Sequence, residues 1–259
     1  MQFLFRVINY SLRHIIKILP KKYELPINYF KYRVMGLNEP ELLILPNLIS
    51  KGGTAIDIGA NIGFYSYVVS RICDKVEAFE PIPYCCSILQ AYNAPNINVH
   101  GVALSSKSGT AVLNIPIVNN MEIYGRASVS NDFPSQKTIQ VSLKKLDDYN
   151  FTNVNFIKID VEGHELDVIR GAKDTITKYQ PVILVEIEQR HLSFPMNLVF
   201  EEILAYGYKG FFLYQSKFHP ISEFSSEFHQ ALLTTEENMK DNRNYINNFI
   251  FSTESLPYV

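Results

Sequence analysis

The stretch Asp57-Ile58-Gly59-Ala60-Asn61-Ile62-Gly63 decides the fold of this 259-residue chain. It continues a short β-branched run, Thr54 to Ile58, and leads into a helical segment, Gly63 to Ile72. A buried strand therefore turns into a helix at this point. Its two glycines allow a tight turn and leave room for a ligand against the main chain. Turns of this kind bind nucleotides at the edge of open α/β sheets.

A second acid, Glu80, ends the next predicted strand, Lys75 to Phe79. A carboxylate there can accept hydrogen bonds from both hydroxyls of a ribose. A dinucleotide fingerprint needs a glycine where Asn61 stands, and the carboxylate of Asp57, expected at the mouth of the loop, would repel a pyrophosphate. S-adenosylmethionine has no phosphate and carries a sulfonium and an ammonium group. The charges therefore favour S-adenosylmethionine over a nicotinamide dinucleotide.

The rest of the chain alternates β-branched runs with helical segments, which indicates a mostly parallel sheet with helices on both faces. Further strands are predicted over Ile97 to Leu104, Val154 to Asp160 and Val182 to Glu188, and further helices over Tyr84 to Tyr92 and Glu165 to Tyr179. A hairpin-like excursion is predicted over Ala111 to Ile115 and Thr138 to Leu143, and an antiparallel pair that closes the sheet over Gly210 to Tyr214 and Phe249 to Ser252.

The adenine ring is expected beside the third predicted strand. Ala103 and Leu104 would supply apolar walls there, and Ser105 or a main-chain amide would reach the ring nitrogens.

The cluster Lys158-Ile159-Asp160-Val161-Glu162-Gly163-His164-Glu165 also lies where a strand ends and a helix begins. Alternation along the strand puts Lys158 and Asp160 on one side. A buried lysine needs a partner, so Lys158 is either a counter-ion for Asp57 and Asp160 or a catalytic group. Capping of the helix explains Glu162 and Glu165. It does not explain His164, whose neutral imidazole would suit a general base.

The sequence resembles the FkbM-type methyltransferases between about Pro40 and Glu188. The matching segments are the Gly53 to Gly63 loop, Ala78-Phe79-Glu80-Pro81, Gly125-Arg126-Ala127-Ser128, Ile157 to Glu165 and Val168-Ile169-Arg170-Gly171-Ala172. The resemblance implies a class I methyltransferase fold, a Rossmann-like sheet of seven mostly parallel strands whose last strand is antiparallel. It also implies S-adenosylmethionine as the methyl donor and O-methylation of sugars, glycans, lipids or polyketide hydroxyls.

For the cofactor, the expected contacts are Asp57, Gly59, Asn61, Gly63, Glu80, Ala103 and Asp160. A base that removes the acceptor proton accelerates methyl transfer. His164 is the first candidate and Asp160 the second, followed by Glu186 or Glu188, with Lys158 as a further catalytic candidate. His191 is a reserve candidate that is expected to be a surface loop residue. A Mg²⁺ ion on Asp160 and Glu186 is an alternative that is not favoured.

Composition limits the partners. The net charge of -2 and pI near 6.3 give no general attraction to nucleic acid. Only 3 cysteines occur, two of them adjacent, which favours a reducing cytosol. Residues 1–39 are expected to form a basic, amphipathic helical extension, in which Met1 to Leu19 either packs on protein or lies on a membrane surface at its cytoplasmic face. Residues 40–259 are expected to form the catalytic domain, with a core over 40–190 and a sheet-closing segment over 191–259.

The acceptor is expected to be a small molecule, a glycan or a lipid-linked sugar. The segment Gln215 to Asn248, with Phe218, Phe224 and His229, would form a lid or acceptor platform, or simply cover the sheet. The competing functions are a nicotinamide-dependent oxidoreductase and a non-catalytic domain that binds cofactor or a partner.

Overall fold

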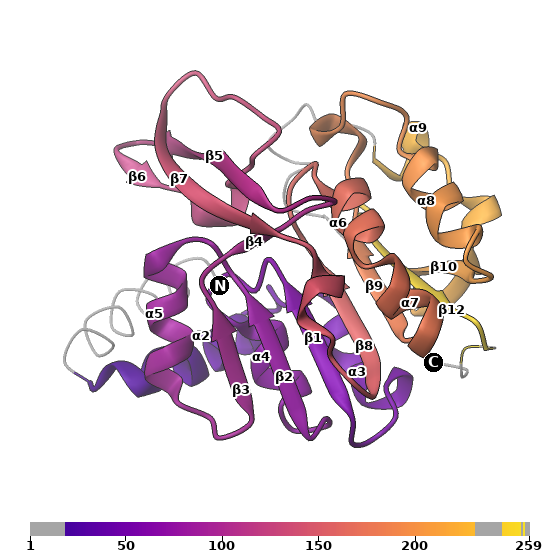
Figure 1. Cartoon of the computed structure of the whole chain (residues 1–259), viewed down its shortest axis with the longest axis horizontal. Helices are drawn as coiled ribbons and strands as arrows, with labels where there is room; N and C mark the ends of the chain where they lie inside the picture. The colour runs from indigo at the N-terminus through magenta and orange to yellow at the C-terminus, as the bar shows by residue number, and fades with distance from the viewer. Residues whose placement is uncertain (1–18, 231–244, 255, 257–259) are drawn as a thin grey trace.

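A computed structural model describes residues 19–230, 245–254 and 256. It contains an eight-stranded sheet whose central strands are parallel (Figure 1). The strand order is β11 (Lys217–Pro220), β10 (Lys209–Tyr214), β12 (Asn248–Ser252), β9 (Val182–Glu186), β8 (Val154–Ile159), β1 (Thr54–Ile58), β2 (Lys75–Phe79) and β3 (Ile97–His100).

The predicted antiparallel pair at the end of the chain is confirmed. Strand β12 runs antiparallel to β9 and to β10, and so closes the sheet. The sheet has eight described strands where seven were expected, because β11 forms a hairpin with β10 inside the segment Gln215 to Asn248, for which no strand was predicted. Phe224 and His229 beyond that hairpin stack on each other and contact Phe212. These two rings cover the sheet, as the simpler of the two sequence interpretations predicts.

The hairpin-like excursion forms a second sheet that stands above the first (Figure 1). Its strand order is β4 (Ala103–Leu104), β7 (Gln136–Lys144), β5 (Gly109–Val118) and β6 (Met121–Glu122). The predicted third strand, Ile97 to Leu104, is therefore wrong in extent, because β3 ends at His100 and Ala103 pairs with Leu143 of β7. The chain changes sheets beside the edge where ligands are expected.

Helices cover both faces of the main sheet. The α-helices are α2 (Glu24–Val34), α3 (Glu41–Leu48), α4 (Phe64–Val69), α5 (Pro83–Tyr92), α6 (Glu165–Gly171), α7 (Lys173–Tyr179), α8 (Asn197–Leu204) and α9 (Ser226–His229). Short 3-10 helices are η1 (Lys21–Tyr23), η2 (Tyr124–Arg126), η3 (Leu146–Tyr149), η4 (Gln189–His191) and η5 (Ile221–Glu223). The single helix expected over Glu165 to Tyr179 breaks at Ala172 into α6 and α7.

Alternation along the strands separates two cores. Ile56, Ile157 and Val185 pack with residues of α6, α7 and α8 on one face, whereas Ala55 and Phe156 pack with α3 and α4 on the other. Asp57 and Lys158 point to the same face of the sheet as Ala55 and Phe156 and therefore lie beneath α3 and α4. None of the described helices is both long and apolar enough to cross a bilayer. The predicted amphipathic helix over Met1 to Leu19 lies outside the described residues, apart from Leu19.

Candidate active site

An open cleft of about 610 Å³ lies at the carboxyl edge of β1, β2 and β8, under the second sheet. This edge is where open α/β sheets bind ligands. Gly59, Asn61 and Glu80 line it from below, and Asp160, Glu162 and His164 from the loop between β8 and α6. The remaining lining residues are mostly apolar: Ile58, Phe79, Pro81, Ile82, Val102, Ala103, Leu104, Leu113, Tyr124, Gly125, Ala127, Val129 and Val161.

Gly59 is required by the packing of the loop. Its φ is +77°, and a Cβ atom built on it would lie 1.7 Å from the main-chain oxygen of Asp160. The ends of β1 and β8 therefore approach so closely that no side chain fits between them. Gly63 has φ +96° and a different neighbour, because a Cβ there would meet Leu89 at 2.3 Å. Gly63, which was expected to contact the cofactor, directly precedes α4 and is not among the residues that line the cleft.

Glu80 is a buried carboxylate, 4% exposed, on the floor of the cleft. Its two oxygens accept hydrogen bonds from the main-chain amides of Asn61 and Ile82, each at 2.8 Å. Burial raises the pKa of Glu80 to about 7, despite these hydrogen bonds. A carboxylate offers about four lone-pair sites. Two therefore remain for ligand hydroxyls, as the sequence predicts for a ribose.

Asp57 does not lie at the mouth of the loop as expected, since its side chain is 2% exposed and accepts a 2.6 Å hydrogen bond from Ser66 of α4. Burial raises its pKa to about 6, against the opposing influences of Ser66 and Lys158. Asp57 pairs in register with Lys158 across β1 and β8. Asp57 therefore belongs to a charge network below the cleft, and the acids that line the cleft are Glu80, Asp160 and Glu162.

Lys158 is the centre of that network and is 1% exposed. Its Nζ lies 4.0 Å from Asp160 Oδ2, 3.9 Å from Glu186 Oε2 and 3.3 Å from Asn248 Oδ1. Burial lowers the pKa of Lys158, but the surrounding carboxylates outweigh burial and raise it overall. This surrounding fits the counter-ion interpretation of Lys158, which is not among the residues that line the cleft.

Glu39, a residue that sequence reasoning missed, completes the network. It accepts hydrogen bonds from Tyr65 at 2.5 Å and from Asn248 at 3.0 Å, and its charge raises the pKa of Lys158. Asn248 is 209 positions away in the sequence. No pattern in the sequence pointed to this contact, because it depends on how the loop before α3 packs against β12.

Asp160 and Glu186 are brought together at the ends of β8 and β9. Asp160 is 31% exposed, Glu186 is 17% exposed, and the two side chains share a hydrogen bond. Burial, and then the charge of Asp160, raises the pKa of Glu186 well above its ordinary value. The two carboxyl groups therefore bind a proton more tightly than isolated carboxyl groups do. Lys158 already contacts both carboxyl groups, so the pair that forms the unfavoured, alternative Mg²⁺ site has a resident cation.

His164 caps the start of α6 and lines the cleft. Its Nε2 lies 3.0 Å from Ser105 Oγ and its Nδ1 3.3 Å from Ser130 Oγ. Burial lowers its pKa, with Asp167 acting in the opposite direction. The imidazole is neutral near pH 7, as expected, but both of its nitrogens already contact serine hydroxyls. Ser105, which was expected to reach the adenine ring, contacts His164 and is not among the residues that line the cleft.

Glu162 and His191 meet beside the cleft. His191 was expected to be a surface residue, but its side chain is only 9% exposed, and its Nε2 lies 3.2 Å from Glu162 Oε2. Burial and the neighbouring acids Asp160 and Glu188 raise the pKa of Glu162 to about 8. Ser128 of the Gly125 to Ser128 segment donates a 2.6 Å hydrogen bond to the main-chain oxygen of Glu162. This bond ties the second sheet to the β8–α6 loop.

Comparisons with known proteins agree with this geometry. The family described as the methyltransferase FkbM domain matches residues 57–210. "Methyltransferase 1" of Beauveria bassiana (strain ARSEF 2860) is 29% identical over 144 residues, covering 46% of this chain and 58% of that protein. "Methyltransferase sdnD" of Sordaria araneosa is 29% identical over 155 residues, covering 46% of this chain and 60% of that protein. The chain thus spans about 60% of the length of these curated relatives.

Among solved structures, the crystal structure of the FkbM methyltransferase from Methylobacillus flagellatus KT superposes with a TM-score of 0.50 at 18% identity. The match covers 78% of this chain and 44% of that chain, and shows a shared fold. The family match includes the glycine loop that begins at Asp57, the cleft acids and the loop after β8. The chain belongs to the FkbM methyltransferase family.

Proposed function

We propose that this chain transfers the methyl group of S-adenosylmethionine to a hydroxyl of a neutral, polyhydroxylated acceptor, the sugar of a glycan or glycolipid. One observation carries the proposal. The described residues that line the cleft include three carboxylates, Glu80, Asp160 and Glu162, and neither lysine nor arginine. Such a lining suits a cationic cofactor and offers no positive charge to a diphosphate or a phosphorylated acceptor. It therefore also disfavours the nicotinamide alternative.

The residues present fit the cofactor. Gly59 lines the cleft without a side chain, Glu80 has free lone pairs for ribose hydroxyls, and Ala103 and Leu104 give the cleft an apolar surface that suits an adenine ring. When bound, S-adenosylmethionine supplies an electrophilic methyl group on a sulfonium. Asp160 lines the cleft at the end of β8, and its carboxylate would complement that cation.

Asp160 is also the better base. A base needs a free lone pair within reach of the acceptor hydroxyl. The nitrogens of His164 contact Ser105 and Ser130, whereas Asp160 is 31% exposed at the cleft. Its pKa is raised by burial, with Lys158 acting in the opposite direction, and a raised pKa makes a carboxylate a stronger proton acceptor. Glu186, which forms a hydrogen bond with Asp160, can share the proton that Asp160 takes up.

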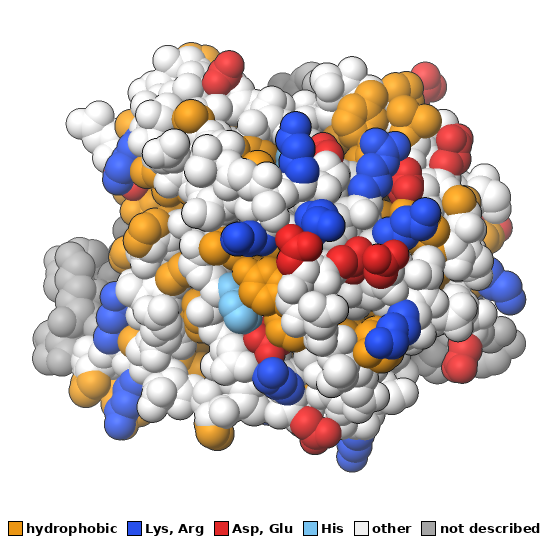
Figure 2. Space-filling model, viewed as in Figure 1, with side chains coloured by type: hydrophobic (Ala, Val, Ile, Leu, Met, Phe, Trp, Pro, Cys, Tyr) orange, Lys and Arg blue, Asp and Glu red, His pale blue; other side chains and the backbone are white. Residues whose placement is uncertain are grey.

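The proposal of a sugar acceptor draws on two further features. Carboxylates accept hydrogen bonds from vicinal hydroxyls, and Asp160 and Glu162 lie together at the open side of the cleft. Tyr124 also lines the cleft and packs against Tyr84 at 5.0 Å between ring centroids, which provides an aromatic surface. On the face of the molecule shown in Figure 2, basic and acidic side chains intermingle, without a broad basic area that would attract nucleic acid.

The test is a methyl-transfer assay with methyl-labelled S-adenosylmethionine and a panel of neutral oligosaccharides, their phosphorylated counterparts and a short RNA. We expect label in neutral sugars only, and a loss of at least ~10²-fold in Asp160→Asn, the size of a missing general base. His164→Gln is the matched variant and should retain more activity than Asp160→Asn. Label transferred to the RNA or to phosphorylated sugars in preference to neutral ones would refute the acceptor class.

A further inference from the structure

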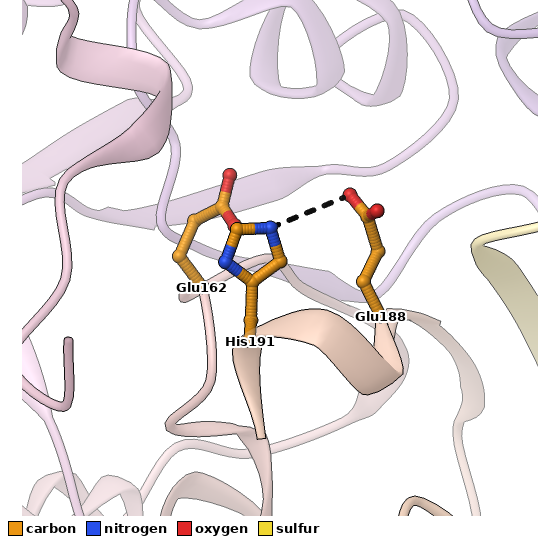
Figure 3. A group of neighbouring side chains, drawn as sticks. All are labelled: Glu162, Glu188 and His191. Atoms are coloured by element: carbon orange, nitrogen blue, oxygen red, sulfur yellow. Dashed lines mark ion pairs between the residues drawn. The ribbon is translucent and has the colours of Figure 1, made fainter. Parts of the chain in front are cut away.

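Three side chains converge in a small cavity next to the cleft: Glu162 from the loop after β8, and Glu188 and His191 from the segment after β9 (Figure 3). His191 Nε2 lies 3.2 Å from Glu162 Oε2 and 3.8 Å from Glu188 Oε1. One potential ligand atom from each residue lies within 4.8 Å of the others. Figure 3 shows the imidazole between the two carboxylates. This is the arrangement of ligands around a single ion.

The cavity also contains polar atoms without hydrogen bonds. His191 Nε2 is buried and makes no hydrogen bond with any described group, although a carboxylate oxygen is close by. Glu165, which is 2% exposed, lines the same small cavity, and its Oε2 is likewise unpartnered. Buried polar atoms are nearly always satisfied, and leaving one unpaired is costly. Two such atoms around one cavity indicate that a ligand completes it.

The main chain holds the converging residues in place. Glu162 adopts φ +45°, which is unusual for a side chain of its kind. A Cβ on Gly163 would lie 2.5 Å from the main-chain oxygen of His191, so the two loops are in direct contact. Asn131 donates 3.2 Å hydrogen bonds from Nδ2 to the main-chain oxygens of both Glu162 and His191. Such outer contacts preorganise metal ligands.

The charge around the cavity fits a divalent ion. Five carboxylates line it: Asp160, Glu162, Glu165, Glu186 and Glu188. Two cations contact these acidic groups: Lys158 contacts Asp160 and Glu186, and Arg190 contacts Glu188. A third cation, Arg126, acts electrostatically on His191. Acidic groups therefore outnumber basic ones around the cavity.

Glu188 already has two partners, since Arg190 donates to it at 2.9 Å and Tyr245 donates to its other oxygen. Each carboxylate oxygen has more than one lone pair, and carboxylates that bind metals are commonly hydrogen-bonded from outside in this way. These partners therefore fix the orientation of Glu188 and leave the lone pairs that face His191.

We propose that Glu162, Glu188 and His191 bind a divalent transition-metal ion such as Mn²⁺ or Zn²⁺. An imidazole nitrogen with two carboxylates suits these ions better than Mg²⁺ or Ca²⁺, which prefer oxygen ligands throughout. Asp160 and Glu162 line both this cavity and the cleft. If the proposed function holds, an ion held by Glu162 would lie next to the cleft and could act as a Lewis acid on the acceptor hydroxyl, with Asp160 as the base.

The experiment is a titration of Mn²⁺ into the chelator-treated full chain without S-adenosylmethionine, followed by the electron paramagnetic resonance signal of free Mn²⁺. We expect one ion bound per chain and little displacement by a hundredfold excess of Mg²⁺. Glu188→Gln and His191→Gln should each weaken binding at least ~10-fold, as removal of a ligand does. The matched control is the exposed pair His219 and Glu223, 2.9 Å apart, where the same substitutions should change nothing.

No loss of the free Mn²⁺ signal in the wild type would overturn the site, and so would wild-type affinity in both ligand variants. Displacement by equimolar Mg²⁺ would overturn the choice of a transition metal. If His191→Gln does not fold, Glu162→Gln takes its place, and wild-type affinity in that variant would equally overturn the site. Calorimetry with S-adenosylmethionine on the same metal-free samples separates the two proposals, because Mn²⁺ binding without cofactor binding refutes the proposed function alone.

Discussion

Replacing Lys158 with methionine should destabilise the protein strongly and in a pH-dependent manner. The substitution keeps the length of the side chain but removes the cation that faces Asp160 and Glu186 at 4.0 and 3.9 Å and offsets the buried Asp57. Breaking a buried ion pair by removing one partner costs ~3–5 kcal/mol. We expect this loss in the free energy of unfolding at pH 7, measured by urea denaturation.

The loss should shrink toward pH 5, because carboxylates without their cation take up protons instead. Lys158 has a raised pKa in the fold, so its own contribution is complete below its unfolded pKa of about 10.4. The control is Lys137→Met, which removes an exposed partner of Glu122 and should cost less than ~1 kcal/mol. A Lys158→Met variant within ~1 kcal/mol of the wild type at pH 7, or a loss that does not vary with pH, would refute the reasoning.

Three further outcomes follow from the same contacts. Gly59→Ala places a Cβ 1.7 Å from a main-chain oxygen and should lower the free energy of unfolding by ~3 kcal/mol or more in urea denaturation. The control is Gly109→Ala, which should change little because its Cβ would meet nothing within 4 Å. Equal losses in the two variants would contradict this prediction. Burial raises the pKa of Asp57 to about 6 and those of Glu41 and Glu80 to about 7. Above pH ~4 the native state therefore binds more protons than the unfolded state, and the free energy of unfolding falls as the pH rises. The free energy of unfolding should therefore be at least ~2 kcal/mol lower at pH 8 than at pH 5.5, and an increase would contradict the assignment. Glu80→Gln should weaken S-adenosylmethionine binding by ~1.5–3 kcal/mol in calorimetry, the value of hydrogen bonds to a charged group; unchanged affinity would exclude Glu80 from the cofactor site.

The central strands and the cleft were predictable because their signals are local. β1 and β2 have the predicted bounds, since a β-branched run ends at a glycine turn in one case and at an acid followed by proline in the other. Gly59, Asn61 and Glu80 line the cleft because parallel strands place their carboxyl ends at one edge, and Ala103 lines it from the second sheet.

What the sequence did not reveal depends on contacts between distant segments. Ala103 leaves the main sheet because it pairs with Leu143, and no local pattern marks that exchange. Glu39 reaches the Lys158 network through Asn248 and Tyr65, and His191 is buried because the loop after β9 packs on Gly163. Helical periodicity in the sequence also continues through Ala172, although the helix breaks there in the structure. At the neighbouring Gly171 the chain packs closely on a distant segment, because a Cβ there would lie 2.0 Å from the main-chain oxygen of Ser105.

The central claim is that the acidic cleft binds a cationic methyl donor and no dinucleotide. Isothermal titration calorimetry of S-adenosylmethionine, S-adenosylhomocysteine and NADH against the folded chain tests it most directly. We predict micromolar binding of the first two, abolished or strongly weakened in Gly59→Ala and Glu80→Gln, and no heat with NADH. Binding of NADH, or no binding of either adenosyl compound by a chain shown to be folded, would contradict the account.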